Sequence, residues 1–368
     1  MSATPDAPFD SAKAEAFAGR FINALNDAAL CLMVSIGHRL GLLDAMRDHA
    51  PETSHELARR TKLNERYVRE WLGALATSGV LEVDPDGPRF RLPAEHAARL
   101  TRPAGADNLA AFTQYIPILG MVEEDILTCF REGGGVPYEK FPRFHAVMAE
   151  DSAQSVIVAL EQHILPLVPG LADRLRTGID MLDLGCGRGM ALIRLAELFP
   201  ASRFTGMDFS REAVEWARAE AVRRGVADRV RFLVVDLSDF DAKAEPARYD
   251  FVTTFDAVHD QAKPMSLLKG IHRTLRPAGI YVMQDIKGSS HVHENLDHPL
   301  GTLLYTVSCL HCMTVSLAQG GEGLGAMWGE QKTREYVKRA GFRSFVKHEL
   351  AHDIQNNWYV IGNSGGGL

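Results

Sequence analysis

A glycine-rich run after an apolar segment is the part of the sequence best suited to hold a ligand. Asp183 stands near the end of the apolar segment, and Gly185, Cys186, Gly187 and Gly189 follow it. Glycines at this spacing allow a sharp turn and let the backbone come close to a bound molecule. Such a loop is weak evidence by itself, because dinucleotide-binding sheets carry a related loop with a different glycine spacing.

Two more carboxylates follow the next two predicted strands. Asp208 ends the strand predicted over 203–208, where it could accept hydrogen bonds from two ribose hydroxyls. Asp236 follows the strand predicted over 230–235 and could accept from an adenine amino group, while Asp183 could meet a ligand ammonium through water. With no Lys or Arg pair for a pyrophosphate, the set favours a cationic nucleoside. The predicted site also includes three flanking side chains: Phe209, Leu237 and Phe255.

Together these features resemble the class I S-adenosylmethionine-dependent methyltransferases. The resemblance rests on the Asp-x-Gly-Cys-Gly-x-Gly run from Asp183, on the acidic end of the second strand and on Asp236, and it covers about residues 165–363. It implies S-adenosyl-L-methionine as the cofactor and a Rossmann-like sheet as the fold.

The fourth predicted strand, residues 250–255, is followed by a candidate base. His259 and Asp260 come at the carboxyl end of the sheet, and imidazole is the side chain best suited to move a proton near neutral pH. The segment resembles the strand-end His-Asp of small-molecule O-methyltransferases, which also carry an N-terminal winged-helix dimerisation domain. This resemblance implies that His259 is the general base, with Asp260 beside it in the catalytic site. Gln261 replaces the Trp common in those enzymes, which leaves the phenolic substrate class open, and a helix-capping His259 remains the alternative.

Residues 287–328 form an insertion that is short of charge but rich in polar side chains. A surface loop would carry more charge, so we expect the insertion to fold over the substrate. The predicted pocket residues are Tyr138, Tyr305, His311, Cys312 and Trp328. Cys309 and Cys312 form one half of a CxxC pair without a second half at structural-zinc spacing, so no metal site is predicted. Thiol chemistry on a metalloid, which would use these cysteines and Cys186, stays open.

The elements that must position these residues alternate between apolar strands and helices. Further strands are predicted over 179–184 and 279–286, and a final pair without an intervening helix over 342–350 and 357–361. The pattern predicts an α/β fold: a Rossmann-like class I methyltransferase sheet of seven strands with a terminal antiparallel hairpin. We assign 178–364 to this cofactor-binding domain and 105–177, which Gly133–Gly135 interrupt, to a helical linker or lid region.

Residues 1–104 predict an α-helical winged-helix domain. A helical pattern over 11–46 carries an apolar stripe that includes Phe17, Phe21 and Leu25, and a helix-turn-helix followed by a hairpin lies between 51 and 102. Basic and acidic residues are nearly balanced in that module, which disfavours DNA binding and favours packing. The stripe predicts a homodimer.

Composition sets the remaining expectations. A net charge of −7 over 368 residues disfavours a surface built for nucleic acid or anionic lipid, and five scattered cysteines suit reduced thiols in a cytoplasmic protein. The longest stretch without charge, 298–321, is too polar to predict a membrane span. Three segments, Gly134 to Tyr138, Phe255 to Gln261 and Tyr305 to Trp328, make the whole sequence resemble a family of winged-helix methyltransferases from bacteria and invertebrates. That family includes a mycobacterial member labelled a transcriptional regulator. Small-molecule O-methylation is the predicted function. N- or S-methylation on the same scaffold, and a regulator that binds S-adenosylmethionine, are the alternatives.

Overall fold

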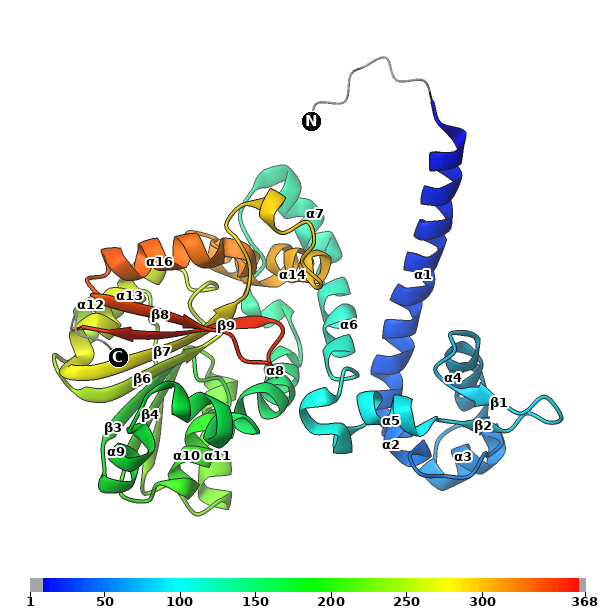
Figure 1. Cartoon of the computed structure of the whole chain (residues 1–368), viewed down its shortest axis with the longest axis horizontal. Coiled ribbons are helices and arrows are strands. Elements are labelled where there is room, and N and C mark those ends of the chain that lie inside the picture. The colour runs from blue at the N-terminus through cyan, green and yellow to red at the C-terminus, as the bar shows by residue number, and fades with distance from the viewer. Residues whose placement is uncertain (1–8, 364–368) are drawn as a thin grey trace. The chain divides into compact units, whose positions relative to one another are not determined.

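The computed structural model describes residues 9–363, and the chain divides into two compact units between Pro117 and Ile118 (Figure 1). The first unit is helical with one small hairpin, and the second holds a seven-stranded sheet. Helix α6 (Tyr115–Gly120) spans the boundary between them.

The first unit begins with a long helix. α1 runs over Ser11–Leu40, and the side chain of Asp10 caps it by accepting a hydrogen bond from the backbone N–H of Lys13. The helix ends at Gly41, whose φ of 71° lies in the left-handed region that glycine adopts without strain. α2 then covers Leu42–Met46. One glycine therefore breaks the helical pattern that the sequence predicts over 11–46.

The predicted winged helix is present in the first unit. Its elements are α3 (Ser54–Thr61), α4 (Glu65–Thr77), β1 (Glu82–Val83), β2 (Phe90–Arg91) and α5 (Ala94–Leu100). Thr53 and Glu56 form a capping box at the start of α3. The apolar residues of α3 and α4, among them Leu57 and Leu72, are buried with the C-terminal end of α1, so this module has its own core.

The sheet of the second unit has the predicted topology. Its strands are β3 (Asp180–Leu184), β4 (Arg203–Asp208), β5 (Val230–Val234), β6 (Tyr249–Phe255), β7 (Leu275–Ile286), β8 (Ser344–His348) and β9 (Asn356–Gly362). Their order is β5-β4-β3-β6-β7-β9-β8, and β9 runs antiparallel to its neighbours β7 and β8. The predicted mixed sheet with a terminal hairpin is confirmed. Because β3, β4, β5 and β6 are parallel, their carboxyl ends meet at one side of the sheet.

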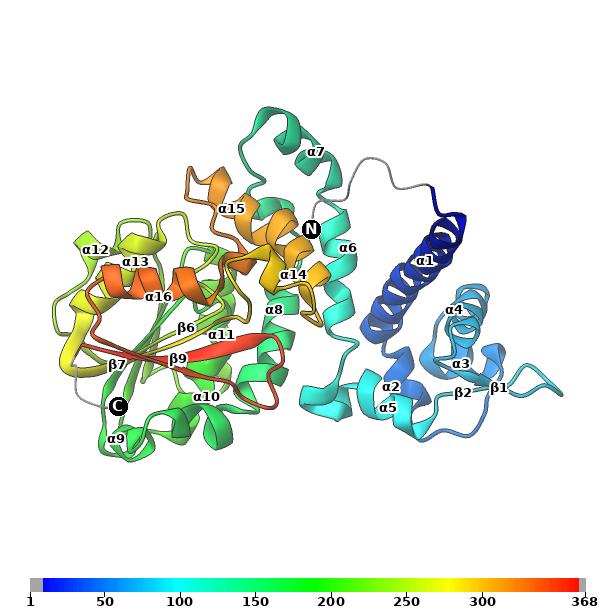
Figure 2. The ribbon, with the colours of Figure 1, turned by 45° about the horizontal axis from the view of Figure 1, so that its top comes forward.

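Helices cover both faces of the sheet (Figures 1 and 2). One face packs against α9 (Leu171–Thr177), α10 (Met190–Leu198) and α11 (Arg211–Arg223). The other face packs against α12 (Phe240–Lys243), α13 (Pro264–Thr274) and α16 (Gly329–Arg339). Because helices cover both faces, the central strands are buried on both sides and appear in the sequence as continuous apolar runs.

Two helical regions lie at the carboxyl ends of the strands. The first contains α7 (Glu123–Glu132) and α8 (Phe144–Ser152), which is followed by two π-helical turns. The second is the insertion, where α14 (Gly301–Val307), a π-helical turn (Ser308–Cys312) and α15 (Met313–Ala318) follow one another without a break. The hydroxyl of Thr314 accepts a hydrogen bond from the backbone N–H of Val136 (2.7 Å), which ties the two regions together.

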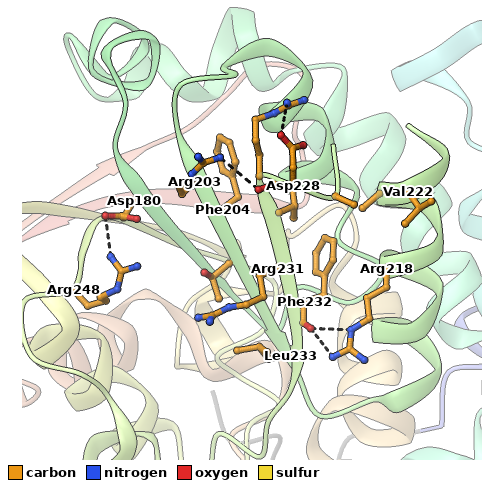
Figure 3. Close-up of a pocket in the computed structure, with 15 residues that line it drawn as sticks. Asp180, Arg203, Phe204, Arg218, Val222, Asp228, Arg231, Phe232, Leu233 and Arg248 are labelled. Atoms are coloured by element: carbon orange, nitrogen blue, oxygen red, sulfur yellow. Dashed lines mark hydrogen bonds and ion pairs between the residues drawn. The ribbon is translucent and has the colours of Figure 1, made fainter. Parts of the chain in front are cut away.

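Figure 3 shows a pocket of about 610 Å³ beside the edge strand β5. Its lining includes Asp180, Arg203 and Arg248, which lie at or just before the amino ends of β3, β4 and β6, so the pocket is at the opposite end of the strands from the glycine-rich loop. The guanidinium of Arg218 donates twice to the carbonyl of Phe232 (3.0 and 2.7 Å). These bonds occupy an edge-strand carbonyl that could otherwise pair with another strand.

Two of the described helical stretches, Ser11–Leu40 and Gly301–Ala318, are long and apolar enough to cross a membrane by length and composition alone. A core helix of a soluble protein passes the same test, so this is weak evidence. In the second stretch the buried side chains include His311, Thr314 and Ser316. These three polar side chains therefore face the protein interior.

Candidate active site

The glycine-rich run forms the turn between β3 and α10. Gly185, Gly187 and Gly189 have φ values of 70°, 50° and 65°, which only glycine adopts readily. A Cβ on Gly185 would lie 2.5 Å from the Cβ of Ala257, and one on Gly189 would lie 2.2 Å from the ring of Phe232. The loop thus needs glycine for its backbone angles and for its close approach to neighbouring strands.

Asp208 ties this loop to the end of β4. Its Oδ2 accepts from the backbone N–H of Gly187 and its Oδ1 from that of Ser210, both over 2.8 Å. The backbone N–H of Cys186 donates to the carbonyl of Met207 (3.2 Å). Burial raises the pKa of Asp208, and the two backbone hydrogen bonds oppose this rise. Each carboxylate oxygen still has a lone pair for a ligand donor.

Asp183 and Asp236 lie at the ends of the two neighbouring strands, in different environments. Asp183 is buried, its Oδ1 accepts from the hydroxyl of Thr253 (2.8 Å), and burial raises its pKa to about 7. Asp236 is exposed, and its pKa is lowered by hydrogen bonds from Ser238, whose backbone N–H lies 2.9 Å from Oδ1. The three carboxylates predicted from the sequence therefore follow three adjacent parallel strands.

The predicted flanking side chains differ in their surroundings. Leu237 is buried in the core on one face of the sheet, and Phe255 packs edge to face on Trp358 in the core of the other face (ring centroids 6.0 Å). Phe209 is partly exposed and contacts Tyr138. Of these three, only Phe209 is shown in contact with a residue of the predicted substrate pocket, Tyr138 in the loop after α7.

His259 is buried, and its hydrogen-bond partner is Asp285. Imidazole Nδ1 lies 2.8 Å from Asp285 Oδ1, and the indole N–H of Trp328 donates to the same oxygen (3.0 Å). The carboxylate of Asp260 instead accepts from the side-chain amide of Gln261 (3.2 Å). Asp285 is not among the site residues predicted from the sequence. The signal was available, because Asp285 is an acidic residue near the end of a predicted buried strand.

The charges around His259 shift several pKa values. Burial lowers the pKa of His259, but the charge of Asp285, the neighbouring Cys312 and hydrogen bonds to both raise it well above its usual value. Burial raises the pKa of Asp260 to about 6, although the charge of His259 lowers it. Burial and the charge of Asp285 raise the pKa of Asp256, whose φ of 49° is unusual for a residue other than glycine.

Among residues 9–363, one group of side chains offers three possible metal ligands within 4.8 Å of one another: Asp256, His259 and Asp285. His259 Nδ1 and Asp285 Oδ1 lie at hydrogen-bond distance, so these two atoms are engaged with each other. The arrangement matches the orienting pair of a general base, in which a carboxylate holds one imidazole nitrogen and leaves the other for a substrate.

A cluster of rings lies next to His259. Tyr138 contacts His145 (ring centroids 4.9 Å, stacked) and His311 (5.2 Å, edge to face). Phe144 stacks on His311 at 3.6 Å with the ring planes only 9° apart. Burial and the charges of Asp260 and Asp208 raise the pKa of Tyr138. Four predicted pocket residues, Tyr138, His311, Cys312 and Trp328, are therefore brought close to His259 or to its partner.

Tyr305, the fifth predicted pocket residue, lies elsewhere. Its hydroxyl accepts from the side-chain amide of Asn295 (3.1 Å), and its ring lines a separate cavity of about 540 Å³ together with His298 and Cys309. No contact between Tyr305 and His259 is found among the described residues. The prediction that Tyr305 contacts the substrate remains a proposal.

Two family models match the chain. The Rv2258c-like winged HTH domain matches residues 28–102, and a methyltransferase domain matches residues 175–341. An uncharacterized protein of Synechococcus is 33% identical over 100 residues, 27% of this chain and 24% of that protein. The 27-O-demethylrifamycin SV methyltransferase of Amycolatopsis mediterranei is 32% identical over 111 residues, 30% of this chain and 40% of that protein. The chain thus spans well under half the length of these curated relatives.

Solved structures share the fold over nearly the whole chain. The mitomycin 7-O-methyltransferase MmcR superposes with a TM-score of 0.68 and 19% identity, over 96% of this chain and 100% of that one. Human N-acetylserotonin methyltransferase, solved in complex with SAM, gives a TM-score of 0.66 and 19% identity, over 99% of this chain and 100% of that one. The chain combines an Rv2258c-like winged helix-turn-helix domain with a methyltransferase domain of the class I, S-adenosylmethionine-dependent fold.

Proposed function

We propose that this chain, with its class I methyltransferase domain, is a small-molecule O-methyltransferase that uses S-adenosyl-L-methionine and takes His259 as its general base. The observation that carries the proposal is the buried pair of His259 and Asp285. The pair lies at the carboxyl ends of β6 and β7, on the same side of the sheet as the three predicted cofactor carboxylates of β3, β4 and β5. The O-methyltransferases among the structures of similar fold are consistent with it.

The residues present fit this cofactor. Three of the five residues from Gly185 to Gly189 are glycines, and the space beside Gly187 is open, so a nucleoside could come close to the backbone there. Asp208 retains lone pairs on both oxygens for ribose hydroxyls. Asp183 is a buried carboxylate with a pKa of about 7, so a ligand ammonium would stabilise its charged form. Exposed Asp236 is available to an adenine amino group.

The chemistry follows from the orientation of the imidazole. The bound cofactor would supply an activated methyl group on a sulfonium. Asp285 accepts from His259 Nδ1, so Nε2 is the atom that could remove a proton from an acceptor hydroxyl, which would take the place of Cys312 as its partner. Trp328 donates to the same carboxylate oxygen and so fixes the orientation of Asp285. A neutral hydroxyl attacks poorly until it is deprotonated, so the base is required for an oxygen acceptor.

Turnover of labelled S-adenosylmethionine across a collection of hydroxyl, amine and thiol acceptors tests the proposal. We expect methylation of a hydroxyl acceptor, and His259→Ala should lower kcat by about 10² to 10⁴. Calorimetry should show unchanged affinity of this variant for S-adenosylhomocysteine. Full activity of His259→Ala would favour the alternative of an amine, thiolate or metalloid acceptor. His259 would then be a helix-capping residue.

The proposal includes a second copy of the chain as partner. The stripe on α1 is exposed in the single chain, with Phe17 at 62%, Phe21 at 57% and Leu25 at 61% exposure. Such a continuous apolar face is expected to be covered by another surface. A well-folded monomer at micromolar concentration in sedimentation would contradict the dimer.

DNA is a poor candidate partner for the winged helix. On α4, Arg66 is paired with Glu70, and Arg69 donates two hydrogen bonds to Glu65 (2.9 and 2.8 Å). These arginines are already neutralised on their own helix, so the proposal keeps the packing role and a cytoplasmic location. Nanomolar, sequence-dependent binding of a duplex in a mobility-shift assay would instead support the regulator alternative.

A further inference from the structure

His311 has no hydrogen-bond partner although it is almost completely buried. His311 is 1% exposed, and neither Nδ1 nor Nε2 of its ring has a hydrogen-bond partner within residues 9–363. Burial and the nearby charges of His259 and His145 lower its pKa to about 3, so the ring is neutral at ordinary pH. A neutral imidazole carries one donor and one acceptor, and leaving both unpaired inside a protein is costly.

The local backbone directs His311 toward the reaction site. It lies on the π-helical turn Ser308–Cys312, an irregularity that is frequent at functional sites. Both His311 and the next residue, Cys312, are buried, while Ser308 is only half-buried. Cys312 hydrogen-bonds His259, so the unpaired imidazole is next in sequence to a side chain that contacts the proposed base.

The rings around His311 leave its nitrogens unsatisfied. Phe144 covers one face of the imidazole at 3.6 Å, and Phe141 meets it edge to face at 4.7 Å. Hydrogen bonds to imidazole are made in the plane of the ring, so a ring stacked on its face does not satisfy them. The near-parallel stack shows that a flat ring fits against His311 at this position.

We propose that His311 is a binding residue for the methyl acceptor, and that the acceptor is a flat aromatic molecule with a second, uncharged hydrogen-bonding group beside the hydroxyl that is methylated. The methylated hydroxyl would face His259, and the second group, a hydroxyl or carbonyl, would pair with His311. A carboxylate is disfavoured there, because a neutral imidazole in a dry site cannot compensate a buried charge. This inference rests on the proposed function and narrows its substrate class.

The segment that carries Tyr138 and Phe144 follows three consecutive glycines, Gly133 to Gly135. Gly133 and Gly134 have φ values of 77° and 83°, so they adopt backbone angles that other residues avoid. Gly135 packs directly on the backbone of α15, where a Cβ would lie 2.0 Å from the carbonyl oxygen of Thr314. The segment that carries Tyr138 and Phe144 therefore starts from a point held against α15, the helix that follows the turn of His311.

The test uses the full chain labelled with ¹⁵N in its histidines and saturated with S-adenosylhomocysteine. The probes are phenol, with one hydroxyl, the three dihydroxybenzenes, with two, and 2-hydroxybenzoate, whose second group is charged. We expect at least one dihydroxybenzene to shift the ring nitrogens of His311 and to bind about tenfold more tightly than phenol, while 2-hydroxybenzoate gains nothing. The His311 signals are assigned by their loss in His311→Leu.

Variants separate binding from structure. His311→Leu should lose the preference for the dihydroxybenzene, and His311→Gln, which keeps one donor and one acceptor, should retain part of it. Because His311→Leu removes an unpaired polar group, its thermal midpoint should be equal to or above that of the wild type. His293→Leu, a matched change of an exposed histidine in the same insertion, should alter neither the preference nor the midpoint.

Three results would overturn the inference: equal affinity for phenol and every dihydroxybenzene, probe binding that leaves the His311 nitrogens unshifted, or no binding of any aromatic probe to a chain that binds S-adenosylhomocysteine. A large fall in the midpoint of His311→Leu would also overturn it, since it would give the imidazole a structural partner. If S-adenosylhomocysteine itself does not bind, the proposed function fails first, and the two failures are therefore distinguishable.

Discussion

Replacing Asp285 by Asn should lower the pKa of His259 strongly. Asp285 is fully buried, and its Oδ1 accepts from His259 over 2.8 Å and from Trp328 over 3.0 Å. Asn keeps the size and one acceptor oxygen but removes the charge. In the native chain the charge of Asp285 helps to raise the pKa of His259 against the effect of burial, so without it burial should prevail.

The size of the effect follows from the separation of the two groups. Two unit charges about 4 Å apart interact by about 4 kcal/mol at an effective dielectric constant of about 20, which corresponds to about 3 pH units. Partial compensation by the retained amide oxygen makes about 2 units a reasonable lower bound. Asp285→Asn should therefore move the pKa of His259 from well above its usual value to below it.

The assay is an NMR titration of ¹⁵N-labelled His259 in the complex with S-adenosylhomocysteine. Asp260→Asn is the matched control. Its carboxylate bonds Gln261 and not His259, and the substitution should shift the titration by less than about 1 unit. With an acceptor in hand, the rate should rise with pH as His259 loses its proton. The lower limb of the kcat/KM profile should then move to lower pH in Asp285→Asn, although the plateau falls because the imidazole is less well oriented.

A His259 titration in Asp285→Asn that stays within about 0.5 unit of wild type, which corresponds to about 0.7 kcal/mol, would contradict the role of Asp285. A larger shift in Asp260→Asn would contradict it as well. That second result would restore Asp260 as the partner of His259, as the sequence alone suggests.

Other measurements test the remaining parts of the site. Asp208→Ala removes a carboxylate that can make charge-assisted hydrogen bonds worth about 1.5 to 3 kcal/mol each. Calorimetry should therefore show that the variant binds S-adenosylhomocysteine at least about tenfold more weakly than wild type. An unchanged affinity would exclude the cofactor assignment. Because the pKa of Asp183 is about 7 and an ammonium prefers the charged carboxylate, the affinity for S-adenosylhomocysteine should fall as pH drops below 7. Binding should release a proton, and Asp183→Asn should abolish this release. An affinity that stays flat between pH 6 and 8, about one unit on either side of this pKa, would contradict the proposed contact of Asp183 with the ligand. A chelator should not affect methyl transfer, because His259 Nδ1 is engaged with Asp285. If a chelator abolished activity and Mn²⁺ or Zn²⁺ restored it, Asp256, His259 and Asp285 would instead be metal ligands.

The sequence predicts the cofactor side of the site better than the acceptor side. Asp183, Asp208 and Asp236 are found because each lies at or just after the carboxyl end of a strand, and parallel strands bring such positions to one side of a sheet. Periodicity and strand order are local signals that a sequence carries directly. The same logic applied to the end of β7, which contains Asp285, identifies this residue as well. Asp260 is next to His259 in the sequence, but Asp285 is its partner in space.

The acceptor side depends on contacts that no local pattern encodes. Helical spacing in 301–318 does not reveal the π-helical turn at Ser308–Cys312, and that turn decides which side chains face inward. As a result His311 and Cys312 are placed near His259, whereas Tyr305 lines a separate cavity. The stacking of Phe144 on His311 joins residues far apart in the chain, and nothing in either segment alone predicts it.

The charges of the site link the methyl donor to the proposed base. Burial raises the pKa values of Asp183 to about 7 and of Asp260 to about 6, so without a bound cation this side of the sheet binds protons that exposed carboxylates would release. The raised pKa of His259 keeps the imidazole protonated under the same conditions, and a protonated imidazole cannot act as a base. A cationic ligand placed among these carboxylates would favour their charged forms and would also disfavour a second positive charge on His259. Because a positive charge placed near His259 favours its neutral form, we expect binding of the methyl donor to favour proton loss from the proposed base.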